Sequence, residues 1–289
     1  MTAGSTEGLA GSPAMAAAAV EPPELRRATF ADFPAIHRLE SRFLTNIFAP
    51  DDRRALFEDN PLWPRVSAHW PVGWVLEDAD GTLVGSVTNV PSPYVLGGEE
   101  KIAGNGLAWA VTPEHRGYAA LLMDEYFMQD EADLVVSSNV GVGATPIWQA
   151  YGTAVPLGDW SRAAYVVTNR RAFTREVLAM KGIPLPGALA VPGAAALAVK
   201  ERFRSPRLPD VPADVEIGES QAFDDRFDTF WEELRAQNQG VLLAVRDRAT
   251  LAWHFRIPLR GGRLRVFTAS RGGRMRAYCL VKEYERPSG

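Results

Sequence analysis

The sequence has few of the residues that build covalent or metal-bound frameworks. A single cysteine, Cys279, excludes an internal disulfide and a site made of several thiolates. The four histidines lie far apart and form no HxxxH pair, so we expect no metal site. Cys279 stands in an apolar alternation with Tyr278 and Leu280, which predicts a buried structural thiol rather than a nucleophile.

Long apolar runs and an excess of basic charge are also missing. No stretch reaches the roughly 18 apolar residues of a bilayer span, so no membrane segment is expected. A net charge of −4 argues against sequence-independent binding of nucleic acid, which needs a basic surface. Residues 1–24 are mostly small, with two adjacent prolines and no aromatic ring, which predicts a disordered tail. No Lys or Arg precedes their weak apolar patch, so a secretory signal is not expected. We therefore expect a cytoplasmic protein.

What the chain does contain is the composition of an ordinary globular protein, with 46% hydrophobic and 23% charged residues. Periodicity then predicts an α/β (α+β layered) domain over residues 25–168, with a mixed, mostly antiparallel sheet flanked by helices. The expected elements are strand 25–30, helices 33–44 and 51–57, strands 74–78, 82–90 and 101–111, helix 118–128, strand 133–138, helix 144–150 and strand 161–167.

The rest of the chain divides into a linker and a second half. Residues 169–212 read as a linker with a helix to about residue 180, followed by many prolines and glycines. Residues 213–289 repeat the opening order of the first domain. They are expected to form strand 215–219, helices 222–234 and 249–255, and a hairpin of residues 263–270 and 274–284 around Gly272 and Gly273.

The segment VTPEHRGYAALLM, residues 111–123, has the pattern of an anion site. A strand ends at Val111, Pro113 removes a ladder donor, and the chain turns through Arg116 and Gly117 into a helix. The first N–H groups of a helix lack partners and carry partial positive charge, which favours a phosphate. Small residues at 117, 119 and 120 would let that phosphate approach the backbone, and Arg116 would add a charge-assisted contact.

This segment resembles the V-x-P-x-x-R-G-x-G-x-G/A signature of the GNAT acyltransferases, in which the amides after the fourth strand hold the pyrophosphate of CoA. Val111, Pro113, Arg116 and Gly117 match, whereas Leu121 replaces a glycine and leaves less room. The resemblance covers residues 25–167 and implies acetyl-CoA as acyl donor. The cofactor-binding residues that it implies are Val111, Arg116, Gly117, Tyr118, Ala119, Ala120, Leu121 and Asn139, the last with helix capping as an equal alternative.

The proton-transfer groups follow the family pattern less closely. Relatives commonly place a tyrosine four residues before the glycine that ends the next helix, but counting back from Gly152 reaches Trp148, whose indole is no acid. Tyr151 is the nearby candidate, with water as the alternative. For the base, Glu114 is the candidate among four residues near the fourth strand, and solvated positions are the alternative for all of them: Glu99, Glu100, Glu114 and His115.

The resemblance therefore implies an N-acetyltransferase that acts on a small-molecule or peptide amine by direct attack in a ternary complex. A covalent intermediate is not expected, because G-x-S-x-G is absent and Cys279 lies outside the domain. A protein that binds CoA or a partner without turnover is the alternative. The second half, which lacks a segment like residues 111–123, is expected to bind no CoA and either to close the acceptor site or to form a homodimer.

Overall fold

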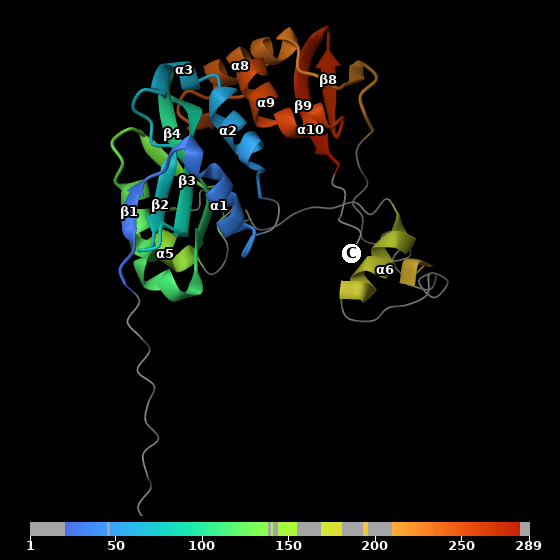
Figure 1. The fold of residues 1–289 in the computed structure, drawn as a ribbon. Helices are drawn as coiled ribbons and strands as arrows, with labels where there is room; N and C mark the ends of the chain where they lie inside the picture. Colours follow the sequence, from blue (N-terminus) through green and yellow to red (C-terminus); the bar gives the residue numbers. More distant parts are fainter. Residues whose placement is uncertain are drawn as a thin grey trace, which may run out of the picture. The chain divides into compact units, whose positions relative to one another are not determined.

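A computed structural model describes residues 21–44, 47–137, 140, 144–154, 169–180, 193–195 and 210–283 (Figure 1). The chain forms two compact units, one of Met1–Gly141 with Glu216–Gly289 and the other of Val142–Val215. No helix within the described ranges is long and apolar enough to cross a membrane. Those ranges also contain no group of three His, Cys, Asp or Glu side chains placed to hold a metal ion.

The first unit is built on a six-stranded sheet. Five strands follow the order β1-β2-β3-β4-β5. They are β1 (Glu24–Arg27), β2 (Gly73–Glu77), β3 (Leu83–Leu96), β4 (Glu99–Val111) and β5 (Leu134–Val136). All neighbours pair antiparallel except β4 and β5, which are parallel. The sixth strand, β7 (Leu243–Ala244), comes from the C-terminal half and pairs antiparallel with β3. The mixed, mostly antiparallel sheet expected from the sequence is thus confirmed.

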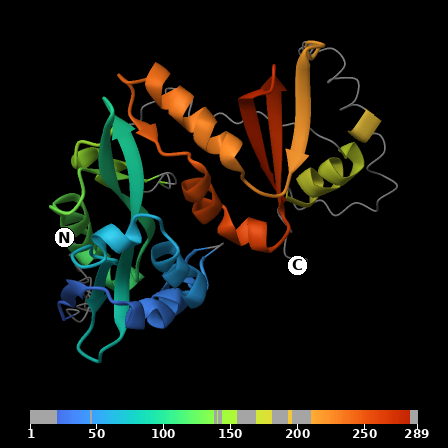
Figure 2. The same ribbon diagram turned by 90° about the horizontal axis from the view of Figure 1, so that it is seen from above.

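Helices cover both faces of this sheet, as Figure 2 shows for the teal strands between green and blue helices. The helical elements are η1 (Phe30–Asp32), α1 (Phe33–Glu40), α2 (Pro50–Glu58), α3 (Trp63–Val66) and α4 (Ala119–Phe127). On one face, Arg53 of α2 reaches Thr88 of β3. On the other face, Leu122 of α4 packs closely against Gly85 of β3, where a side chain would leave less room for Leu122.

One helix of the N-terminal half is shorter than the sequence predicts, and one short helix there is not predicted. The helix expected over residues 33–44 ends at Glu40, and the amides of Phe43 and Leu44 close turns onto the Glu40 carbonyl. Helix α3 is not among the helices expected from the sequence, because a proline such as Pro64 is also typical of a segment that ends a helix. Proline is tolerated in the first turn of a helix, where its missing N–H would have no partner, and that is where Pro64 lies.

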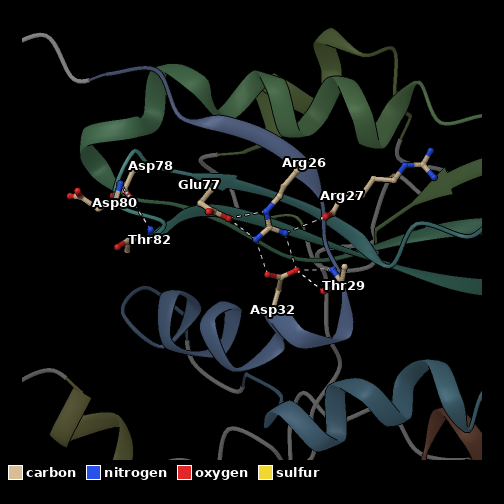
Figure 3. Close-up of polar contacts among 8 residues, drawn as sticks. All are labelled: Arg26, Arg27, Thr29, Asp32, Glu77, Asp78, Asp80 and Thr82. Atoms are coloured by element: carbon tan, nitrogen blue, oxygen red, sulfur yellow. Dashed lines mark hydrogen bonds and ion pairs between the residues drawn. The ribbon is translucent and has the colours of Figure 1, made fainter.

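Arg26 joins three elements at the N-terminal edge of the sheet (Figure 3). Its guanidinium donates to both oxygens of Asp32 in η1, at 2.8 and 3.0 Å, and its Nε donates to Glu77 of β2 at 2.8 Å. Asp32 also accepts the Thr29 amide at 2.8 Å. The contacts are structural, because they hold the chain entering α1 against β1 and β2.

The C-terminal half adds a three-stranded sheet of order β6-β8-β9. Its elements are β6 (Val215–Ser220), α8 (Asp225–Gln237), α9 (Arg248–His254), α10 (Arg256–Arg260), β8 (Leu264–Arg271) and β9 (Arg274–Lys282). The hairpin predicted here is confirmed, since Gly272 and Gly273 take the positive φ values, 58° and 71°, that a tight turn needs. Figure 2 shows β8 and β9 in red.

The prediction that Cys279 is buried is wrong. Cys279 is exposed and pairs across the hairpin with Phe267. Side chains alternate between the two faces of a strand, and it is Tyr278 and Leu280 that pack against the core of this half. The predicted strand is therefore correct, but Tyr278 and Leu280, and not Cys279, are the residues whose side chains face the core.

The C-terminal half of the first unit also contributes to the core of the N-terminal half. Trp253 of α9 is 7% exposed and packs with the buried aromatic and aliphatic residues of the N-terminal half. Its Nε1 donates to the Leu56 carbonyl of α2 at 3.1 Å, and Arg256 donates to the Asp52 carbonyl of the same helix at 2.7 Å. The Val245 amide donates to the carbonyl of Pro93 at 3.0 Å, next to the pairing of β7 with β3.

The second unit contains α5 (Thr145–Ala150) and α6 (Arg170–Met180), both of which were predicted. Gly152 follows α5 with a φ of 74°, the left-handed conformation that commonly ends a helix. The strand expected over residues 161–167 lies outside the described residues.

Candidate functional site

A bulge interrupts β4 shortly before its end. Ser86 of β3 pairs with Ala110, but Thr88 pairs with Leu107, so two residues of β4, Ala108 and Trp109, lie opposite a single residue of β3. Ala108 has a φ of 55°, and it is the one non-glycine residue with positive φ in the described ranges. Such a conformation costs about 1–3 kcal/mol and is retained mainly where function or packing requires it. Bulges occur often beside active sites, where they redirect the backbone.

The partner on the other side of β4 stops before the bulge. Parallel pairing with β5 covers only residues 103–105 of β4, whereas β4 continues to Val111. Within the described residues, no strand lies beside residues 107–111 on that side. A strand edge of this kind presents N–H and C=O groups that an extended ligand can pair with.

The exit from β4 is firmly held. The Thr112 amide donates to the Val84 carbonyl of β3 at 2.8 Å. The Thr112 hydroxyl also lies 2.9 Å from Nδ1 of His115, and Thr112 is buried. The end of β4 and the start of the following segment are therefore fixed relative to β3.

The turn after β4 is helical, which corrects one part of the prediction. Residues Pro113–Tyr118 form a 3-10 helix, η2, that continues into α4. Proline at the first position presets the helical φ, and Gly117 does not adopt positive φ to break the run. The amides of His115 and Ala119 are not unpaired, because they donate to the carbonyls of Thr112 and Arg116. An anion here would compete with 3-10 hydrogen bonds, whose geometry is poorer than that of α-helical ones.

The predicted cofactor-binding residues that are described lie together on this segment. Arg116, Gly117, Ala120 and Leu121 are exposed, and the remaining three, Val111, Tyr118 and Ala119, are half-buried. The Arg116 guanidinium forms no ion pair with any described residue. A Cβ at Gly117 would meet nothing within 4 Å, so the backbone there is open to a ligand. Leu121 is 37% exposed and thus faces the surface rather than the core.

Of the other predicted site residues, Glu114 lies on this segment and the rest lie elsewhere in the chain. Glu114 is exposed in η2. Tyr151 and Trp148 are half-buried at the end of α5, in the Val142–Val215 unit. Asn139 lies outside the described residues. Of the other base candidates, Glu99 pairs with Lys101, and Glu100 pairs with Arg65 at the exposed start of β4.

A buried ion pair near the bulge was not predicted from the sequence. Glu40 of α1 and Arg53 of α2 have no exposed surface, and Arg53 donates to Glu40 and to the Thr88 hydroxyl. Burial raises the pKa of Glu40 to about 6, against the opposing effect of Arg53. Thr88 is paired with Leu107, so this cluster lies beneath the bulged part of β4. Because both charges are enclosed, they hold α1 and α2 on the sheet and do not meet a ligand.

A signal for this pair was present in the sequence. Glu40 follows Ile36 by four residues and Arg53 precedes Phe57 by four, so each charge lies on the buried stripe of its helix. Two charged residues on the inward faces of adjacent helices are costly to bury unless they pair.

Comparisons with known proteins gave distant structural likenesses. No protein-family model matches the chain, and no curated protein is significantly similar in sequence. A probable N-acyltransferase of Enterococcus faecalis V583 is 13% identical, with a TM-score of 0.49 over 92% of this chain and 56% of its own. A GCN5-related N-acetyltransferase of Kribbella flavida is 12% identical, with a TM-score of 0.48 over 91% and 54%. A GNAT family N-acetyltransferase of Escherichia coli in complex with CoA is 23% identical, with a TM-score of 0.32 over 50% and 72%.

Proposed function

We propose that this chain is a GNAT-type acyltransferase that moves an acyl group, most simply acetyl, from CoA to an amine. One observation carries the proposal. The edge of β4 beside which no described strand lies leads directly into the exposed Arg116 and Gly117 at the start of η2 and α4. CoA has an extended arm with amide groups that leads to a pyrophosphate. The arm can pair with the edge of a strand, and the pyrophosphate can bind at a helix start that carries an arginine.

Each part of this segment has a role in the proposal. The edge of β4 between residue 107 and Val111 pairs with the amides of the pantetheine arm. Arg116 supplies a charge-assisted contact to the pyrophosphate, and Gly117 lets the phosphate approach the backbone. Tyr118, Ala119, Ala120 and Leu121 form the first turns of helix over which the nucleotide lies.

In the proposed reaction, the lone pair of an amine attacks the thioester carbonyl carbon. A C–N bond forms, the carbonyl oxygen takes up negative charge, and the C–S bond then breaks with the electron pair leaving on sulfur. An amide on the bulged part of β4 stabilises the oxyanion. The ammonium proton passes to Glu114 or water, and Tyr151 or water protonates the CoA thiolate. Positioned proton transfer contributes about 10²–10⁴-fold, so either water route gives a slower enzyme rather than an inactive one.

A second candidate is a CoA-binding protein without turnover. Three features favour it: Leu121 in place of a glycine, the engaged amide of Ala119, and Trp148 where a tyrosine is usual. Release of free thiol from acetyl-CoA in the presence of polyamines, amino sugars and peptides separates the two candidates. Trp148→Tyr raising that rate would indicate a weakened enzyme.

Binding of acetyl-CoA is tested by its effect on the melting temperature. Saturation at about 100 times Kd stabilises the folded state by about 2.7 kcal/mol, which corresponds to a shift of roughly 5–10 °C for a chain of this size. The double variant Arg116→Ala/Gly117→Glu should lose the shift, because it removes the cation and places a carboxylate where the pyrophosphate would lie. Arg38→Ala/Gly240→Glu is the matched control, since both residues are exposed and a Cβ at Gly240 meets nothing within 4 Å.

The control double variant should keep the full shift. A wild-type protein whose melting temperature does not respond to acetyl-CoA or to longer acyl-CoA esters contradicts the proposal. Equal responses of the two double variants would show that CoA binds elsewhere.

A further inference from the structure

The bulge of β4 lies opposite one short stretch of β3, from Ser86 to Thr88. Leu107 pairs with Thr88 before the bulge, and Ala110 pairs with Ser86 after it. Ser86 and Thr88 are two residues apart in a strand, so their side chains lie on the same face of the sheet. Leu107 and Ala110 are three residues apart, and both lie opposite this pair only because β4 contains one extra residue. The bulge therefore depends on where this stretch of β3 is held.

A buried charge holds this stretch at one end. Arg53 of α2 donates to the Thr88 hydroxyl and to Glu40 of α1, and neither charged side chain has any exposed surface. Arg53 thereby joins α1 and α2 to β3 at the last residue pair before the bulge. Beyond the bulge, the Thr112 amide donates to the Val84 carbonyl of β3 at 2.8 Å. The bulge thus lies between two points at which the strands are fixed.

The ion pair is not the arrangement that would tie two helices together most strongly. Oε1 of Glu40 and Nε of Arg53 are buried, and among the described residues they have no hydrogen-bond partner. Burial of such atoms lowers stability, and well-packed apolar side chains of similar volume often replace a buried ion pair without loss. Apolar side chains could not donate a hydrogen bond to the Thr88 hydroxyl. That contact is therefore the specific contribution of the pair.

The backbone that is held in this way is strained. Ala108 has a φ of 55°, which a residue with a side chain rarely adopts, and a regular ladder would relieve it. A shift of residues 99–107 by one position would remove the bulge, but it would turn Leu107 away from the core that it packs against. The hydrogen bond from Arg53 opposes the same shift from the side of β3, because it keeps Thr88 in place.

We propose that Arg53, held by Glu40, fixes the bulge of β4 through the Thr88 hydroxyl and so positions the amide that meets the acyl carbonyl of acetyl-CoA. Arg53 and Glu40 are then positioning residues, a role that rests on the proposed function. Loss of the contact displaces this amide from the carbonyl oxygen. The proposed pyrophosphate contact of Arg116 is kept, because Arg116 lies in η2, beyond the fixed Thr112.

The test compares two probes that differ only in the carbonyl oxygen. Calorimetric titrations use acetyl-CoA and S-ethyl-CoA, a thioether with a methylene group in place of the carbonyl. Wild-type protein should bind acetyl-CoA about fivefold more tightly, the effect of one hydrogen bond. Thr88→Val keeps the shape of the side chain without its hydroxyl, so this preference should disappear while the Kd for S-ethyl-CoA stays within about twofold. Thr88→Ser retains the hydroxyl and should keep the preference.

Two further variants separate positioning from stability. Arg53→Met/Glu40→Leu removes both charges together and should fold stably, yet it lacks the contact with Thr88 and should lose the preference for acetyl-CoA. This variant decides the question if Thr88→Val does not fold. Ser86→Ala is the matched control, because the Ser86 hydroxyl is buried on the same face and has no hydrogen-bond partner among the described residues. It should keep the preference.

Separate results overturn the two proposals. Wild-type protein that binds neither probe overturns the proposed function and the positioning role with it. Wild-type protein that binds both probes without preferring acetyl-CoA overturns the positioning role alone. The same conclusion follows if the preference survives removal of the Thr88 hydroxyl or of the two charges, or if Thr88→Ser or Ser86→Ala abolishes it as well.

Discussion

Truncation of Arg53 should reveal how far the buried ion pair stabilises the fold. Arg53→Met removes the guanidinium but keeps most of the side-chain volume, and it leaves Glu40 enclosed without its partner. Breaking such a pair costs about 3–5 kcal/mol in the free energy of unfolding. Arg54→Met on the same helix is the matched control. Arg54 is exposed, and among the described residues it pairs with exposed Glu58 and makes a cation–π contact with Phe30. We therefore expect Arg54→Met to lower the free energy of unfolding by about 1 kcal/mol or less.

The pH dependence identifies the carboxylate as the cause. Because the folded protein raises the pKa of Glu40 from 4.5 to about 6, its contribution to stability is full below pH 4.5 and falls by about 2 kcal/mol as the pH rises through 6. Loss of Arg53 raises this pKa further. The cost of Arg53→Met should therefore be larger at pH 8 than at pH 5, where Glu40 is largely protonated in the wild type and in the variant.

Urea unfolding at pH 5 and pH 8, followed by tryptophan fluorescence, measures both effects. The double variant Arg53→Met/Glu40→Leu should recover most of the loss at pH 8, because two apolar side chains of similar volume need no partners. The reasoning is refuted if Arg53→Met costs no more than Arg54→Met at pH 8, or if its cost is the same at both pH values.

Four further substitutions test other parts of the structure. Arg26 holds the pKa of Asp32 below its usual range, so stability from this pair is present at neutral pH and lost as the pH falls through the folded pKa. In urea titrations, the cost of Asp32→Asn should therefore be largest at neutral pH and become smaller as the pH is lowered below 3.8. Gly106→Ala should lower the melting temperature, because the new Cβ would lie 2.8 Å from a buried tyrosine hydroxyl, whereas Gly117→Ala, with open space at its Cβ, should change it little. Trp253→Ala should cost about 3–5 kcal/mol in chemical unfolding, and an effect confined to the C-terminal half would contradict the shared core.

Most helices and strands could be predicted because their signals are local. The apolar stripe of Phe33 and Ile36, the alternation along β2 and β3, and the glycine turns each appear within a few residues of sequence. Errors arose where a local signal has two structural meanings. Pro64 can end one helix or begin another, and the alternation around Cys279 fits a strand with either face inward.

The candidate site also has one part that can be predicted from the sequence and another part that cannot. Residues 111–121 could be located from the sequence because the strand end, the proline, the basic residue and the helix start follow one another directly. The bulge at Ala108 could not, since alanine has no preference for positive φ and adopts it here only because β3 and β4 are held on both sides of it.

The C-terminal half shows why repeated local patterns do not establish separate folding. Its strands and helices follow the order predicted for a second copy, yet β7 adds to the first sheet and Trp253 completes the first core. Trp253 and Arg256 donate to backbone carbonyls of α2, the helix that carries Arg53. The C-terminal half thus fixes the helix whose arginine lies beneath the bulge of β4. A change in that half can therefore affect the part of β4 beside which no described strand lies, through α2 and the contact of Arg53 with Thr88.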